Sequence, residues 1–133
     1  MASERVETLR RLLGLLNTGD LDAFFDELDP DLEFTPDPSF PDAGTYSGED
    51  LRRWMGEWAL TWEESSLEML ETTELERALL VKSRWHLTAA ATGRAIPVED
   101  FYLVVWFDDG RPTRSAAFFD AERAREVAEG PPG

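Results

Sequence analysis

The feature that most restricts the fold is a change of hydrophobic period close to residue 64. Before it, apolar residues recur every three or four positions, which is typical of amphipathic helices. After it, apolar and polar residues alternate, which is typical of strands with one buried face. Helices gathered ahead of a run of strands indicate an α+β protein in which helices cover one face of a curved sheet.

The first half predicts three helices. Ser3 is a candidate N-cap for a helix through Leu16 that ends at Gly19, and Asp20 is a cap for a second helix over 21–28. The third helix places a set of large apolar residues within one stripe about 100° wide: Leu51, Trp54, Met55, Trp58 and Trp62. An aromatic stripe at helical spacing usually indicates a core helix, and the alternative is a helix that closes an apolar pocket.

The second half predicts an antiparallel meander followed by a short helix. Strands are expected at 32–35, 67–73, 78–91, 95–108 and 111–119. Turn signals at 92–93 and 108–110 predict that the last three strands pair antiparallel, and Asp120 is expected to cap a helix over 121–129. A proline- and glycine-rich stretch over 36–48 predicts a loop long enough to cover a site.

Composition narrows the possible functions. The 133 residues predict one domain with a core over about 4–129 and a flexible tail at 130–133. The chain has no cysteine and one histidine, so we expect no metal site and no other cofactor. A formal net charge of −15 argues against nucleic-acid and membrane partners. The N-terminus lacks the pattern of a signal peptide, so we expect a cytoplasmic protein.

Several local signatures occur in an order that resembles a known family. They are Asn17–Ala23, Leu28–Glu33, Tyr46–Gly48, Phe107–Arg111 and Phe118–Ala124. Together they resemble the SnoaL-like members of the nuclear-transport-factor-2-like superfamily. That resemblance implies a cystatin-like cone: a strongly bent, mostly antiparallel sheet around an apolar pocket, closed by three helices and followed by a short C-terminal helix. It also implies frequent homodimers through the outer face of the sheet.

The resemblance leaves the activity open. The family includes polyketide cyclases, ketosteroid isomerases, limonene-epoxide hydrolases and dehydratases, along with proteins without a known activity, and fold does not determine function. The residues expected to line the pocket and bind a ligand are mostly apolar: Tyr46, Trp54, Trp58, Phe101, Leu103, Val105, Ala117 and Phe119. For Tyr46 alone, the plainer interpretation is an aromatic residue packed in its loop.

Arg84 and His86 are the candidate catalytic pair, because both lie on one face of the strand at 78–91. By resemblance they occupy the place of an inward Arg-x-Asp pair in the epoxide hydrolases. A neutral imidazole there would act as the base, and the arginine would stabilise developing charge. The alternation of the strand predicts the opposite, because it places Trp85 in the core and His86 in solvent.

Two positions depart from the enzymes of the family. Leu103 stands where relatives of the ketosteroid isomerases carry an inward acid, and Ala117 stands where the epoxide hydrolases carry an aspartate. Asp31 and Asp37 would lie near the mouth of the cone. In a chain with 28 acidic residues, each is expected to be a solvated surface charge.

Three functions therefore compete. The first is a pocket protein that binds a small apolar molecule. The second is a cofactor-independent isomerase, cyclase, hydratase or epoxide hydrolase that uses His86 and Arg84. The third is a non-catalytic dimeric interaction module, which the apolar outer residues Tyr102 and Trp106 favour. A cavity of about 300 Å³ or more would separate the first two from the third, and an inward His86 bonded to a second titratable group would favour the enzyme.

Overall fold

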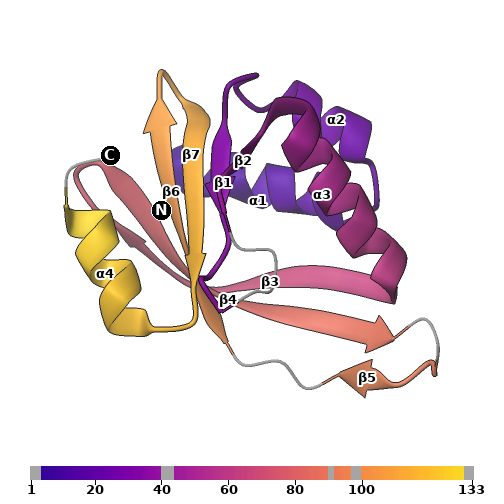
Figure 1. Ribbon diagram of the computed structural model, residues 1–133. Coiled ribbons are helices and arrows are strands. Elements are labelled where there is room, and N and C mark those ends of the chain that lie inside the picture. Colours follow the sequence, from indigo (N-terminus) through magenta and orange to yellow (C-terminus); the bar gives the residue numbers. More distant parts are fainter. Residues whose placement is uncertain (1–3, 40–43, 90–91, 97–99, 131–133) are drawn as a thin grey trace.

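A bent sheet carries the fold, with helices packed on both of its faces (Figure 1). This computed structural model describes residues 4–39, 44–89, 92–96 and 100–130, with the backbone only at 59–65, 89 and 96. The helices are α1 (Glu4–Asn17), α2 (Leu21–Asp26), α3 (Gly48–Thr61) and α4 (Ala121–Glu129). The strands are β1 (Glu33–Thr35), β2 (Tyr46–Ser47), β3 (Trp62–Glu74), β4 (Ala78–Ala89), β5 (Ala95–Ile96), β6 (Phe101–Asp108) and β7 (Arg111–Phe118).

The strands follow the order β2-β1-β7-β6-β4-β3, and β5 pairs with β4. Every pairing is antiparallel except that of β1 with β7. The turn between β6 and β7 places Asp109 at φ 52° and Gly110 at φ 80°, the left-handed pair that a tight two-residue hairpin requires. The α+β architecture and the mostly antiparallel sheet are confirmed.

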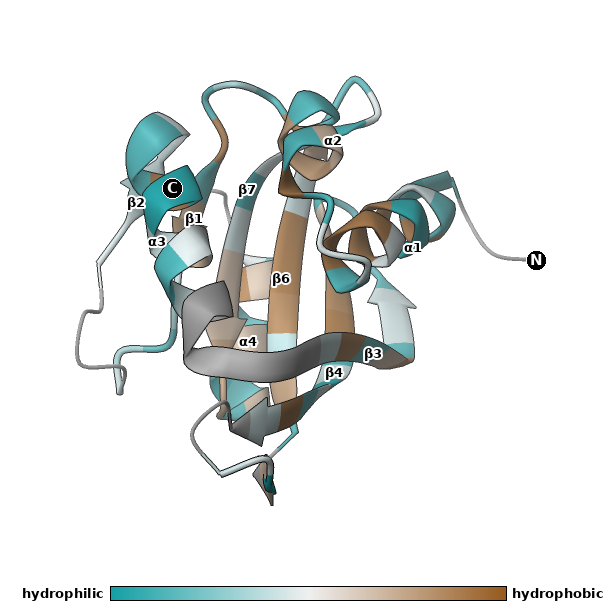
Figure 2. Cartoon of the chain, turned by 90° about the vertical axis from the view of Figure 1, so that its right-hand side faces the viewer, coloured by the Kyte–Doolittle hydropathy of each residue, from teal (hydrophilic) through white to brown (hydrophobic). Residues whose placement is uncertain are grey.

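The two faces of the sheet are covered by different helices. Helices α1, α2 and α3 lie on one face, here called the inner face, and α4 lies on the opposite, outer face (Figure 1). Inner-face residues Leu79, Val81, Leu103 and Val105 pack with leucines of α1. On the outer face, buried residues of β4, β6 and β7 pack with two alanines of α4. Figure 2 shows the apolar side of α1 turned toward the apolar strand β6.

Side-chain hydrogen bonds fix the ends of the helices on the inner face. Asn17, the last residue of α1, donates to the carbonyl of Leu67 at 3.0 Å and accepts from its N–H at 2.8 Å. Gly19 adopts φ 82°, as expected of a residue that ends a helix. The Asp20 carboxylate then accepts from the N–H of Ala23 and caps α2, as predicted. The two hydrogen bonds of Asn17 attach α1 to β3.

Two predicted elements have different limits. Helix α3 ends at Thr61, and Trp62 is the first residue of β3, so the predicted stripe continues only to Trp58. The strand expected at 95–108 is two strands, β5 and β6. Pro97 lies between them, and proline cannot donate a hydrogen bond to a sheet ladder. The predicted cap Ser3 and most of the predicted tail lie outside the described residues.

Within the described part of the chain, no helix is long and apolar enough to cross a membrane.

Candidate functional site

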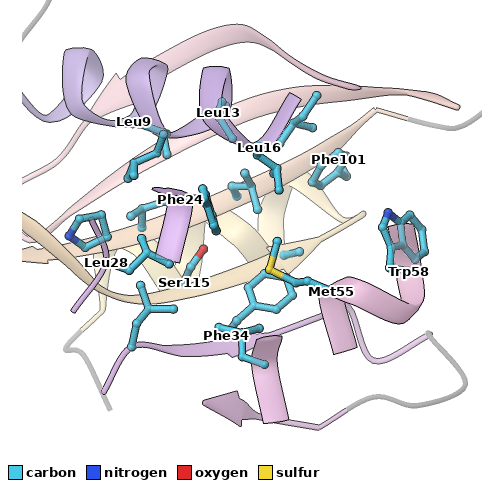
Figure 3. Close-up of a pocket in the computed structure, with 18 of the residues that line it drawn as sticks. Leu9, Leu13, Leu16, Phe24, Leu28, Phe34, Met55, Trp58, Phe101 and Ser115 are labelled. Atoms are coloured by element: carbon cyan, nitrogen blue, oxygen red, sulfur yellow. The ribbon is translucent and has the colours of Figure 1, made fainter. Parts of the chain in front are cut away.

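A cavity of about 150 Å³ lies between the inner face of the sheet and the helices that cover it (Figure 3). Helix α1 contributes Leu9, Leu13 and Leu16, which share one side of the helix because they are spaced at three and four residues. Phe101, Leu103 and Val105 come from alternate positions of β6 and so point to the same face. Of the 23 residues that line the cavity, only Asp37 and Ser115 are polar or charged apart from the tryptophans.

A row of six aromatic rings runs from β2 through α3, β4 and β6 to the residue that follows β7. The rings of the row, in order, are Tyr46, Trp54, Trp58, Trp85, Phe101 and Phe119. Neighbouring centroids lie 5.5, 6.2, 5.8, 5.8 and 6.4 Å apart. Such pairs contribute about 0.5–1.5 kcal/mol each beyond the area they bury. The aromatic row therefore joins core packing to the wall of the cavity.

Asp37 is the one residue in the lining of this cavity whose side chain is a carboxylate. It is partly exposed, and it accepts hydrogen bonds from the N–H groups of Ser39 and Phe119, each at 2.9 Å. Burial acts to raise the pKa of Asp37, but hydrogen bonds from the Ser39 side chain and from the two backbone N–H groups outweigh it and lower the pKa. Asp37 is therefore an ionised acceptor at neutral pH.

Ser115 supplies the second polar group, and its hydroxyl lies among the apolar side chains of the wall (Figure 3). It is a β7 residue paired with Val105 of β6, so both side chains belong to the inner face. A serine hydroxyl both donates and accepts hydrogen bonds. The cavity thus offers a hydrogen-bond acceptor at Asp37 and a group that both donates and accepts at Ser115.

Comparison with known proteins identifies the family. The model of the SnoaL-like domain matches residues 9–115, which is most of the chain. The chain belongs to the SnoaL-like family. No curated protein sequence matches this SnoaL-like domain.

Solved structures share the fold of this SnoaL-like domain at low sequence identity. An NTF2-like protein of unknown function from Burkholderia pseudomallei is 24% identical, with a TM-score of 0.76 and coverage of 93% of this chain and 97% of that chain. TerC co-crystallised with polyporic acid is 19% identical, with a TM-score of 0.76 and coverage of 96% and 100%. A protein with a ketosteroid isomerase-like fold from Catenulispora acidiphila, solved in complex with trimethylamine, is 9% identical, with a TM-score of 0.73 and coverage of 86% of each chain.

The structure places Arg84 and His86 on the outer face of this SnoaL-like domain. The Arg84 guanidinium pairs with Asp100 at 2.8 Å, and the His86 imidazole contacts Glu68 at 2.9 Å. Their side chains are 46% and 54% exposed, and neither residue lines the cavity. Trp85 between them points inward instead. The alternation of β4 is confirmed, and the inward orientation implied by resemblance is wrong, because β4 keeps its regular alternation through these residues.

The ion pair on the outer face shifts the pKa values of both Arg84 and Asp100. The hydrogen bond from Arg84 lowers the pKa of Asp100, and the same bond raises the pKa of Arg84. Both groups are solvent-exposed charges that favour their ionised forms. This stable ion pair is a poor candidate for proton transfer.

The apolar outer residues predicted to face a partner have neighbours within the chain. Trp106 is 4% exposed and packs in a cluster with Ala124 and Ala128 of α4. The guanidinium of Arg114 lies 4.7 Å from the centre of a Trp106 ring. Tyr102 is half-buried at the edge of the same cluster. Helix α4 thus accounts for the burial of Trp106, and the homodimer stays a prediction.

Seven of the eight predicted ligand-binding residues lie in the wall of the cavity. Tyr46 does not line the cavity; its ring stacks on that of Trp54, which does. Whether the other seven contact a ligand stays a prediction. The sequence analysis placed Asp37 near the mouth of the cone but expected a solvated surface charge, and the structure instead places Asp37 in the lining of the cavity. Ser115 was not predicted.

Proposed function

We propose that this SnoaL-like domain binds a small, mostly apolar molecule in the cavity of its cone. The observation that carries this proposal is an open space of about 150 Å³ walled almost entirely by leucine, phenylalanine and tryptophan side chains. Empty space inside a core forfeits packing contacts, so a retained apolar cavity favours an apolar occupant.

The size of the cavity limits the ligand. It is about half the 300 Å³ expected of a typical ligand site, so the cavity does not meet the size that would by itself separate a ligand-binding protein from an interaction module. Apolar cavities of about 150 Å³ accommodate a molecule of the size of benzene. The proposed ligand, or the part of it that enters the cavity, is therefore about as large as one aromatic ring.

Two neighbours with the same fold support the proposal, since their structures contain the small molecules polyporic acid and trimethylamine. Both are less than 20% identical to this chain, so they support the idea that this fold binds small molecules but do not indicate which ligand this chain binds. The family also contains polyketide cyclases.

Catalysis is the second candidate function, and Asp37 is the observation that favours it. His86 and Arg84 lie outside the cavity, and Leu103 and Ala117 carry no titratable group where related enzymes carry acids. Asp37 is the carboxylate that remains. Because its pKa is lowered, it is a weak base and not a general acid at neutral pH.

The test measures the binding of benzene, toluene and indole by ligand-observed NMR or by calorimetry. Ala117→Phe adds a ring inside the cavity, so binding of toluene should fall at least about tenfold. His86→Phe adds the same ring on the outer face and is the matched control, with no expected change. Equal binding by wild type and Ala117→Phe would contradict the proposal.

A second variant covers the case in which Ala117→Phe does not fold. Met55 is half-buried and lines the cavity, where Figure 3 shows its side chain among the wall residues. Met55→Ala should enlarge the cavity and improve binding of indole relative to toluene. An unchanged ratio of the two affinities would count against the cavity as the site.

A further inference from the structure

Asp37 stands in the cavity without a cationic partner among the lining residues. None of those residues is an arginine, lysine or histidine. Its carboxylate accepts hydrogen bonds from the backbone N–H groups of Ser39 and Phe119 and from the Ser39 side chain, and all of these donors are uncharged. The segments outside the described residues contain no arginine, lysine or histidine either. The negative charge of Asp37 is therefore not neutralised by an ion pair within the cavity wall.

The aromatic rings that line the cavity with Asp37 add to its negative electrostatic character. Phe119, whose N–H bonds to Asp37, lies at the end of the aromatic row next to Phe101. Phe101 in turn stacks on Trp85 at an interplanar angle of 7°. The faces of aromatic rings carry negative charge density and attract cations, most strongly when the cation is desolvated. A cavity that is lined by aromatic rings and one carboxylate suits an ammonium group.

The charge of the whole chain acts in the same direction. A formal net charge of −15 produces a negative potential that attracts cations and repels anions. A ligand with a carboxylate or phosphate would meet Asp37 with no positive side chain in the lining to offset the repulsion. A neutral ligand would gain nothing from the ionised carboxylate beyond one hydrogen bond.

We infer that the ligand of this cavity is a small hydrophobic amine, bound as its ammonium ion with nitrogen at Asp37 and its apolar part in the cavity. This inference rests on the proposed binding function and specifies its ligand class. The ammonium donates hydrogen bonds to the Asp37 carboxylate, which still has lone pairs beyond those used by Ser39 and Phe119. The ring of the amine replaces empty space between apolar side chains.

The experiment compares three probes with one ring and different charges: benzylamine, benzyl alcohol and benzoate. At pH 7 benzylamine is a cation, benzyl alcohol is neutral and benzoate is an anion. Wild type should bind benzylamine at least about tenfold more tightly than benzyl alcohol, and benzoate least of the three. Equal affinities for the amine and the alcohol, or tighter binding of benzoate, would overturn the inference.

Asp37→Asn removes the charge but keeps an oxygen that can accept one of the two backbone hydrogen bonds. In this variant the affinity for benzylamine should fall to that for benzyl alcohol, and benzyl alcohol should bind as it does to wild type. Asp31→Asn is the matched control, because Asp31 is an exposed aspartate that does not line the cavity. A preference for the amine that survives Asp37→Asn would overturn the inference.

Two further measurements keep the result decisive. If Asp37→Asn does not fold, a salt series on wild type replaces it: rising salt should weaken the binding of benzylamine and leave the binding of benzyl alcohol unchanged.

Toluene separates the ligand class inferred here from the proposed binding function. Binding of toluene without any preference for the amine overturns the ligand class alone, whereas failure of toluene and all three probes to bind overturns the proposed function with it.

Discussion

The two faces of β4 differ sharply near residues 84–87. The inner face carries Val81, Trp85 and Leu87, of which two are buried and Trp85 belongs to the cavity wall. The outer face carries Arg84 and His86, each about half exposed and each in contact with an acidic neighbour. Residues adjacent in sequence therefore lie in different environments: Trp85 belongs to the cavity wall, whereas Arg84 and His86 are exposed to solvent.

The comparison shows why titratable residues were poor guides to the site. Arg84 and His86 are the two residues of the strand that were expected to act in catalysis, yet both are about half exposed and lie outside the cavity. The cavity instead contains one carboxylate, which is held by a loop. The lining of the site is mostly apolar, and its two polar residues, Asp37 and Ser115, do not belong to β4.

The largest expected effect is that of Trp85→Ala. Trp85 contacts Trp58 and Phe101, so the substitution interrupts the aromatic row and enlarges the cavity. We expect a loss of about 3 kcal/mol in the free energy of unfolding, measured by chemical denaturation. His86→Ala, one residue away on the outer face, should change it by less than about 0.5 kcal/mol. Similar losses for both variants would remove the distinction between the faces.

The next largest expected effect is on the stability that Asp37 contributes to the fold, which depends on pH. Because its pKa lies below the ordinary value of 3.8 in the folded state, Asp37 stabilises the fold fully at pH values above the unfolded pKa. That contribution is lost as the pH falls through the folded pKa. At neutral pH, Asp37→Asn should lose about 1 kcal/mol through its weakened hydrogen bonds.

The measurement is a series of denaturation curves between pH 7 and pH 3. The difference between wild type and Asp37→Asn should shrink as the pH falls below 3.8. Asp31→Asn serves again as the control for a removed surface charge. A difference that is constant over the whole range would show that the Asp37 hydrogen bonds do not depend on its charge.

The sequence predicted the fold better than the site for physical reasons. Periodicity reports which residues are buried, so the helices, the meander and the inward Trp85 were all predictable from it. The break between β5 and β6 was missed because the apolar alternation continues past Pro97. The end of α3 before Trp62 was missed because no glycine or proline separates that helix from β3.

The resemblance placed Asp31 and Asp37 near the mouth of the cone, but nothing in the sequence distinguished Asp37 from Asp31 as a residue of the cavity lining. The place of Asp37 depends on two backbone N–H groups, one of which belongs to Phe119, 82 residues away. A long-range contact of that kind leaves no local pattern. Ser115 was missed for a similar reason, since a serine on a strand gives no sign of which cavity its hydroxyl faces.

The smallest expected effect is on the outer face. Arg84→Ala breaks the ion pair with Asp100, and an exposed pair of this kind contributes little because water and salt screen it. Thermal unfolding should shift by less than about 3 °C, and the shift should disappear in 1 M salt. A larger, salt-independent shift would show that the outer face carries more of the stability than its exposure indicates.

The most direct test of the central claim is an NMR titration of wild type with toluene. His86 is the only histidine of the chain, so its imidazole signals identify the outer face without ambiguity, and the indole signals of Trp58 and Trp85 report on the cavity wall. The account predicts that saturating toluene moves both indole signals and leaves the imidazole signals of His86 unchanged. Shifts at His86 with unchanged indole signals would contradict it.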